Sequence, residues 1–177
     1  MIDVAANRSA SKWTRKEKIG RALWGLAFPF WRASPRIFWG WRRAMLRLFG
    51  ARIGSNVHIY PTVRIAIPWN LRVDDYVAIG DYAIIYSLGK IHFKARATVS
   101  QHAHLCAGTH DWRDATMPLR KPPITIGEDV WICAEAFIGP GVNVAARAIV
   151  GARAVVTKDV AADHIVVGNP AKKVGLR

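Results

Sequence analysis

The sequence predicts a parallel β-helix of triangular cross-section, preceded by a basic helical segment. Three observations support this fold: an aliphatic residue returns every six positions from Ile53 onward, a small or β-branched residue usually follows four places later, and glycine often stands directly after the aliphatic. A period of six matches neither an amphipathic helix, with a period of 3.6, nor a half-buried strand, with a period of 2. Each hexapeptide is therefore expected to form one short side and one turn of a three-sided coil.

The leading aliphatic residues fall into five sets of three, which predict about five stacked coils over residues 53–163. Each coil buries its apolar residues only against its neighbours. The inward position four places on is held by residues such as Val77, Ala103 and Thr109. The sets are Ile53, Ile59 and Ile65; Val73, Ile79 and Ile85; Phe93, Val99 and Leu105; Ile126, Ile132 and Ile138; and Val144, Val150 and Val156.

One long interruption separates the third set from the fourth. Residues 110–123 read HDWRDATMPLRKPP, with three prolines and five charged residues. This composition predicts a loop that leaves the prism between two coils. Long loops on rigid scaffolds commonly carry functional residues, so this loop is the first place to look for a site.

The loop His, the hexapeptide pattern and the later stretches PPITIGEDVWI, GARAVVTKDV and GNPAKKV resemble the hexapeptide-repeat acetyltransferases, which include galactoside, maltose and nodulation-factor O-acetyltransferases. The stretches SPRIFWGWRRAMLRLFGARIG, IYPTVRIAIPWNL and SQHAHLCAGTHDW are similar to the colanic acid (exopolysaccharide) branch of that family. The resemblance covers roughly residues 30–177. It implies a left-handed β-helix, a homotrimer with each active site between two prisms, and acetyl transfer from acetyl-CoA to a saccharide hydroxyl without a metal.

The resemblance also implies roles for single residues. His110 is placed as the general base, a role that suits the ordinary pKa of histidine. Asp111 either orients the ring of His110 or is a solvated loop carboxylate. The predicted acceptor contacts are Tyr86, Ser87 and Trp112, although related sugar acetyltransferases often have Asn where Ser87 stands. The predicted CoA contacts are Trp131 and Ala134 on one coil, Ala152, Thr157 and Lys158 on the next, and Lys172 and Lys173 in the tail at 164–177.

A rival hypothesis is a non-catalytic β-helix or a zinc-binding trimeric β-helix of the γ-carbonic-anhydrase type. The zinc hypothesis arises because His92, His102 and His104 precede the loop and three His plus water suit Zn²⁺. The sequence lacks that family's His spacing on successive coils, and the outward-pointing His102 and His104 also fit a polar surface. Cys106 and Cys133 are read as small apolar residues in a reducing compartment. Without a secretory signal or a membrane span, the expected location is the cytoplasm.

The first 52 residues carry most of the positive charge. They hold 12 Lys and Arg against 2 acids, and residues 53–177 hold 14 against 10, so the net charges are +10 and +4. Between Pro35 and Gly50 we predict a helix that caps the first coil, with apolar Ile37, Phe38, Trp41, Met45, Leu48 and Phe49 on one side and Arg42, Arg43 and Arg47 elsewhere.

Residues 12–32 combine aromatic and basic side chains. Such a composition favours peripheral contact with the inner face of the cell membrane, where a lipid-linked acceptor would be found. The competing interpretation is that these aromatic residues fold back onto the prism. A nucleic-acid partner is not expected, because no nucleic-acid-binding motif accompanies the charge.

Overall fold

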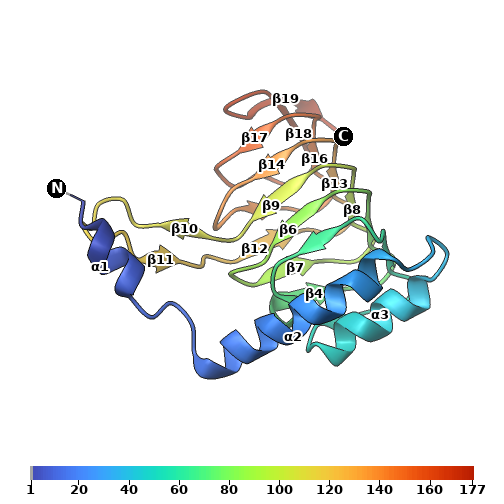
Figure 1. The fold of residues 1–177 in the computed structure, drawn as a ribbon. Helices are drawn as coiled ribbons and strands as arrows, with labels where there is room; N and C mark the ends of the chain where they lie inside the picture. The colour runs from blue at the N-terminus through green and yellow to red at the C-terminus, as the bar shows by residue number, and fades with distance from the viewer. Residues whose placement is uncertain (1) are drawn as a thin grey trace.

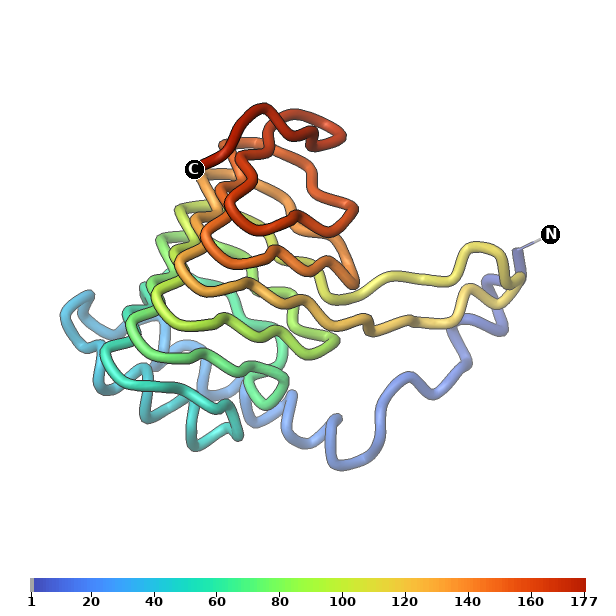
Figure 2. Tube along the Cα trace, turned by 180° about the vertical axis from the view of Figure 1, so that it is seen from behind, coloured from blue at the N-terminus to red at the C-terminus, as the bar shows by residue number. Residues whose placement is uncertain are grey.

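The computed structural model describes residues 2–177 and has the fold of a left-handed parallel β-helix standing on helices (Figure 1). Three helices precede the prism: α1 (Val4–Ser9), α2 (Arg15–Arg32) and α3 (Trp39–Leu48). None of the helices between residues 2 and 177 has the length and apolar content needed to cross a bilayer. The coils rise from the end covered by the helices to the red C-terminal strands, and the C-terminus lies at the end of the prism opposite α2 and α3 (Figure 2).

The prism has three flat faces of short parallel strands. Face A consists of β1 (Arg52–Ile53), β4 (Leu71–Val73), β7 (Ile91–Phe93), β12 (Ile124–Ile126) and β15 (Asn143–Val144). Face B consists of β2 (His58–Ile59), β5 (Ala78–Ile79), β8 (Thr98–Val99), β13 (Trp131–Ile132), β16 (Ile149–Val150) and β18 (His164–Val167), with β19 (Lys172–Leu176) antiparallel to β18. Face C consists of β3 (Arg64–Ile65), β6 (Ile84–Tyr86), β9 (His104–Cys106), β14 (Phe137–Ile138) and β17 (Val155–Val156).

The hexapeptide register is confirmed. On face A, Ile53 stands opposite Val73, Val73 opposite Phe93, and Phe93 opposite Ile126. All of these side chains are buried, as are the small residues four places later, such as Ala97 and Ala136. Between the first and second sets, where the spacing of the leading aliphatics is two residues longer than six, a 3₁₀ turn, η1 (Pro68–Asn70), lengthens the corner without disturbing the register.

The helices close the open end of the first coil with side-chain donors. The outermost strands of a sheet present unpaired carbonyls, which need partners if the edge is covered. Four side chains supply those partners. Their hydrogen bonds run from Arg42 Nε to Ile59 O (2.6 Å), from Arg43 Nη1 to Val57 O (3.1 Å), from Arg47 Nη2 to Ile53 O (2.7 Å) and from Trp24 Nε1 to Ile65 O (2.8 Å).

This arrangement corrects part of the predicted orientation of α3. The helix exists, and Met45 and Phe49 of the expected apolar side pack on the core. Leu48, however, is 83% exposed and Arg42 only 1% exposed, so the side that packs on the prism also contains an arginine. Arg42 also donates to Ser34 Oγ and to the carbonyl of Pro35, both at 2.8 Å. The first coil presents carbonyl oxygens as well as aliphatic side chains, and an arginine satisfies them where a leucine cannot.

Helix α2 begins at a capping box and buries two of its aromatic residues. The Thr14 hydroxyl accepts from the Glu17 amide at 3.2 Å, and the Glu17 carboxylate accepts from the Thr14 amide at 2.8 Å. Trp24 and Trp31 are buried, with ring centroids 5.9 Å apart. These two tryptophans therefore fold back onto the prism, as the competing interpretation of residues 12–32 holds.

Candidate active site

The interruption at 110–123 forms a hairpin that leaves the corner between faces C and A. Its strands β10 (Thr109–His110) and β11 (Leu119–Arg120) are antiparallel, and the hairpin reaches far from the prism (Figure 2). Thr109 was expected to point inward, but it is exposed and pairs with Arg120. Ala107 is the last fully buried residue before the hairpin, because the coil opens there to let the chain out.

His110 is exposed on β10, and one of its ring nitrogens is already engaged. Nδ1 lies 2.6 Å from the carbonyl oxygen of Met117, across the hairpin. A carbonyl can only accept, so Nδ1 carries the proton in the neutral ring and Nε2 keeps its lone pair. Nε2 has no hydrogen-bond partner among residues 2–177 and is free to accept a proton from a substrate.

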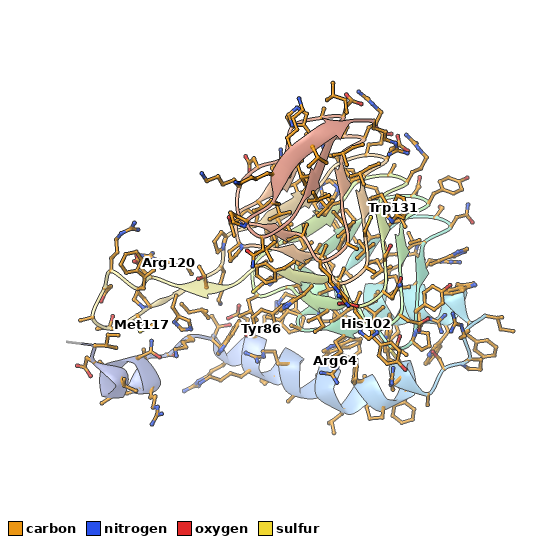
Figure 3. The ribbon with its side chains drawn as sticks, turned by 90° about the horizontal axis from the view of Figure 1, so that it is seen from above. Arg64, Tyr86, His102, Met117, Arg120 and Trp131 are labelled. Atoms are coloured by element: carbon orange, nitrogen blue, oxygen red, sulfur yellow. The ribbon has the colours of Figure 1, made fainter. Side chains whose placement is uncertain are left out.

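The neighbours of His110 differ in what they contact. The Asp111 carboxylate pairs with Arg120 Nη2 at 3.2 Å, so the ring of His110 is held by the Met117 carbonyl rather than by Asp111. Trp112 is 71% exposed, and its ring lies 4.7 Å from the guanidinium carbon of Arg113. Met117 and Arg120 lie on the hairpin well away from the coils (Figure 3).

The N-terminal helix α1 holds the tip of this hairpin. The Asn7 side-chain amide donates to the carbonyls of Thr116 (2.7 Å) and Met117 (2.6 Å), and Lys12 Nζ donates to Asn7 Oδ1 (2.9 Å), which fixes the orientation of the amide. The Met117 carbonyl thus receives bonds from both Asn7 and His110. Sequence analysis missed this contact, because Asn7 stands more than 100 positions from its partners and outside every motif.

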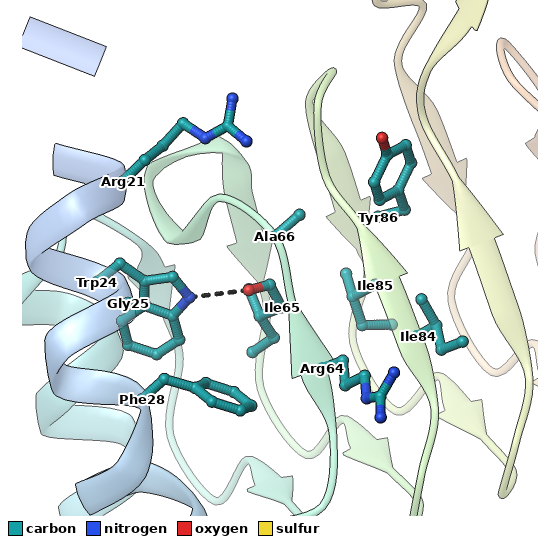
Figure 4. Close-up of a pocket in the computed structure, with 10 residues that line it drawn as sticks. All are labelled: Arg21, Trp24, Gly25, Phe28, Arg64, Ile65, Ala66, Ile84, Ile85 and Tyr86. Carbon is teal, nitrogen blue, oxygen red and sulfur yellow. Dashed lines mark hydrogen bonds between the residues drawn. The ribbon is translucent and has the colours of Figure 1, made fainter. Parts of the chain in front are cut away.

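Tyr86 borders a cleft of about 510 Å³ between α2 and face C (Figure 4). The apolar part of the cleft comes from residues such as Trp24 and Phe28, and its two cationic residues are Arg21 and Arg64. Among residues 2–177, no carboxylate lines the cleft. The cleft is therefore suited to a ligand that carries negative charge, a feature that the sequence motifs did not reveal.

Ser87, the neighbouring predicted acceptor contact, is fully buried. Its hydroxyl donates to the Ile67 carbonyl at 2.9 Å and accepts from the Ile67 amide at 3.0 Å. Ser87 thus ties two successive coils together, and this arrangement gives no support to a contact with the acceptor.

The residues predicted to contact CoA fall into two groups on one chain. Thr157, Lys158, Lys172 and Lys173 line one cleft of about 350 Å³ at the C-terminal end of the prism. Ala134 and Ala152 lie on successive turns between faces B and C, where the Arg153 amide donates to the Ala134 carbonyl at 3.0 Å.

Trp131 stands apart from both groups on face B, opposite the corner from which the hairpin leaves. It is half-exposed, and its indole Nε1 donates to Ser100 Oγ at 2.9 Å. Figure 3 places Trp131 and the hairpin residues on opposite sides of the molecule. One prism therefore does not bring His110 and all the predicted CoA residues to a single surface.

Comparison with known proteins identifies the family. A protein of Escherichia coli (strain K12) named as the colanic acid biosynthesis acetyltransferase WcaF is 40% identical over 148 residues, which cover 84% of this chain and 81% of the relative. The chain belongs to the hexapeptide-repeat acetyltransferases. It is an acyltransferase by that membership, as the sequence motifs predicted. No family model matches the chain.

Solved structures share the fold of this acetyltransferase over nearly its whole length. A maltose O-acetyltransferase from Clostridium difficile 630 superposes with a TM-score of 0.82 at 19% identity, covering 99% of this chain and 97% of its own. A galactoside acetyltransferase in complex with coenzyme A gives 0.84 at 18% identity, covering 98% and 88%. These likenesses extend through the N-terminal helices as well as the coils.

The histidines behind the zinc hypothesis are dispersed in this acetyltransferase. His92 Nε2 lies 2.8 Å from an Asp74 carboxylate oxygen on face A, His102 stacks on Tyr82 at a turn between faces B and C, and His104 lies on face C. Residues 2–177 contain no group of three His, Cys, Asp or Glu side chains placed to hold a metal ion. Burial raises the pKa of the Cys133 thiol, which suits a small apolar residue better than a reactive one.

Proposed function

We propose that the protein transfers an acetyl group from acetyl-CoA to a saccharide hydroxyl, with His110 as general base. The observation that carries this proposal is the hydrogen bond from His110 Nδ1 to the Met117 carbonyl, which leaves Nε2 as the proton acceptor. The acceptor hydroxyl gives its proton to Nε2 as its oxygen attacks the thioester carbonyl. The C–S bond then breaks, and the imidazolium returns the proton to the departing thiolate.

The acceptor is proposed to lie against Tyr86 in the cleft beside α2. Two arginines and an apolar wall without carboxylates favour a saccharide joined to a phosphate-bearing carrier, as in the assembly of surface polysaccharides. This assignment agrees with the name of the E. coli relative, whose pathway is polysaccharide biosynthesis. Trp112, which is highly exposed on the hairpin, is proposed to cover the saccharide.

Acetyl-CoA is proposed to bind in a groove between two prisms of a homotrimer. The lysines at 158, 172 and 173 attract its phosphates, and the small side chains of Ala134 and Ala152 let the pantetheine approach the turns. The separation of these groups from each other and from His110 supports a trimer, because a neighbouring copy can complete each site. Cyclic closure around an axis parallel to the prism suits such a shape.

The test is a thiol-release assay with acetyl-CoA across saccharide acceptors. His110→Ala should lower turnover by roughly two to four orders of magnitude, the usual contribution of a general base. Binding of CoA, measured by calorimetry, should stay within about twofold. Wild-type turnover of the variant on the true acceptor would rule out His110 as the base. A monomeric mass by light scattering would rule out the proposed CoA groove between two prisms.

A further inference from the structure

The outer face of α2 carries an apolar stripe that the prism does not use. Ile19, Leu23, Leu26 and Phe30, here called the apolar stripe, are between 53% and 72% exposed. Their spacing of four, three and four residues aligns them within about 60° on one side of the helix. Trp24 and Trp31, on the other side, are the residues that α2 buries.

Helix α3 and its leading turn expose further large apolar side chains. Ile37, Trp41 and Leu48 are all exposed, and they lie away from Arg42 and Leu46, which pack on the first coil. Single exposed apolar residues need no explanation, but a group of this size on neighbouring helices marks an interaction surface. The cap therefore meets the prism with buried apolar side chains and with donors to carbonyls, and it also presents large apolar side chains to the outside.

The charge around the apolar stripe selects the partner. Residues 1–52 carry a net charge of +10, and Arg15 and Lys16 lie at the N-terminal end of the stripe. Glu17 is one of only two acids in this segment, and its carboxylate is occupied by the capping box. A second copy of the chain would bring two such cationic surfaces together, whereas an anionic lipid surface complements both the charge and the apolar side chains.

We propose that the apolar stripe docks the protein onto an anionic membrane, with α2 lying in the plane of the lipid headgroups. The docking residues are the aliphatic side chains and Phe30 rather than the buried tryptophans. The cleft containing Arg21 and Arg64 opens beside the same helix (Figure 4). The phosphate of a lipid-carried saccharide would then reach the cleft at the level of the headgroups, a step that rests on the proposed function.

Liposome flotation tests the docking without any catalysis. The variant Leu23→Ser/Leu26→Ser/Phe30→Ser should partition at least about tenfold less than wild type onto vesicles of phosphatidylcholine and phosphatidylglycerol, because it removes most of the inserted apolar surface. The matched control Val174→Ser/Leu176→Ser removes two exposed apolar residues at the opposite end of the prism and should float like wild type. High salt or pure phosphatidylcholine vesicles should weaken wild-type binding, since the lysines and arginines act through charge.

Equal flotation of the stripe variant and wild type would overturn the proposal. So would a stripe variant that floats normally but shifts the mass of the protein in solution, because the stripe would then be a contact between copies. The variant's melting temperature checks that it is folded. His110→Ala should float like wild type. Flotation therefore tests the docking even if the proposed acetyl transfer is wrong.

Discussion

The contact between Asn7 and the Met117 carbonyl makes a prediction about turnover. Asn7→Ala removes two hydrogen bonds, of 2.7 and 2.6 Å, from the tip of the hairpin that carries His110. Each such bond contributes about 0.5 to 1.5 kcal/mol net, so the ordered hairpin loses about 1 to 3 kcal/mol. If turnover requires that order, the rate falls by roughly 5-fold to 150-fold, at about 1.4 kcal/mol for each factor of ten.

The assay is steady-state kinetics with thiol detection, and a double-mutant cycle separates positioning from general destabilisation. In the wild-type background, Asn7→Ala should lower kcat with little change in the KM for acetyl-CoA. In the His110→Ala background it should have almost no effect, because there is no ring left to position. Arg8→Ala is the matched control, since Arg8 lies exposed on the same helix.

Two outcomes would refute this reasoning. Unchanged turnover in Asn7→Ala would mean that the hairpin is ordered without α1. Equal losses in the two backgrounds would mean that Asn7 acts on something other than His110.

Three further predictions concern the cap, face C and the tail. Arg42→Met should lower the free energy of unfolding, measured by urea denaturation, by about 2 to 5 kcal/mol, because it leaves buried carbonyls without donors. Arg43→Met should lower it by less, because Arg43 makes one bond, to the Val57 carbonyl. Similar small losses in both variants would contradict this prediction. Burial lowers the pKa of His104 below the ordinary value of about 6.5. As the pH falls below about 6.5, His104 is therefore protonated more in the unfolded chain than in the folded one, and the free energy of unfolding should decrease. His104→Leu should flatten this dependence between pH 5 and 7, and an unchanged pH slope would remove His104 as its source. Lys172→Ala/Lys173→Ala should raise the KM for acetyl-CoA several-fold with little effect on kcat, and an unchanged KM would exclude the tail from the groove.

The repeat predicted the coils well because each coil is specified by its own residues. A leading aliphatic every six positions places Ile53, Val73 and Phe93 on one face without reference to the rest of the chain. Long-range polar contacts have no such period. The burial of Arg42, the coil-to-coil bonds of Ser87 and the grip of Asn7 on the hairpin each depend on a carbonyl far away in sequence, and no local pattern announces them.

The functional motifs also predicted part of the site. His110, which they singled out, lies on a projecting hairpin, and Thr157, Lys158 and the tail lysines line one cleft. The hexapeptide register puts Trp131, beside Ile132, on the second side of its coil, but the motifs did not reveal that the hairpin with His110 leaves on the opposite side of the prism. The exposed side of α2 was obscured for a related reason: both of its faces are apolar, and only packing decides which is buried.

The arginines beneath the first coil also affect how the end of the prism can associate with other molecules. A stack of identical coils has two open ends, and an uncovered end would offer its strands to the end of another molecule, so that prisms could join into filaments. Arg42, Arg43 and Arg47 occupy the carbonyls through which such joining would begin. With these carbonyls already bonded, the first coil offers few free acceptors to a strand of another molecule, so the helical cap protects this end of the prism from edge-to-edge association.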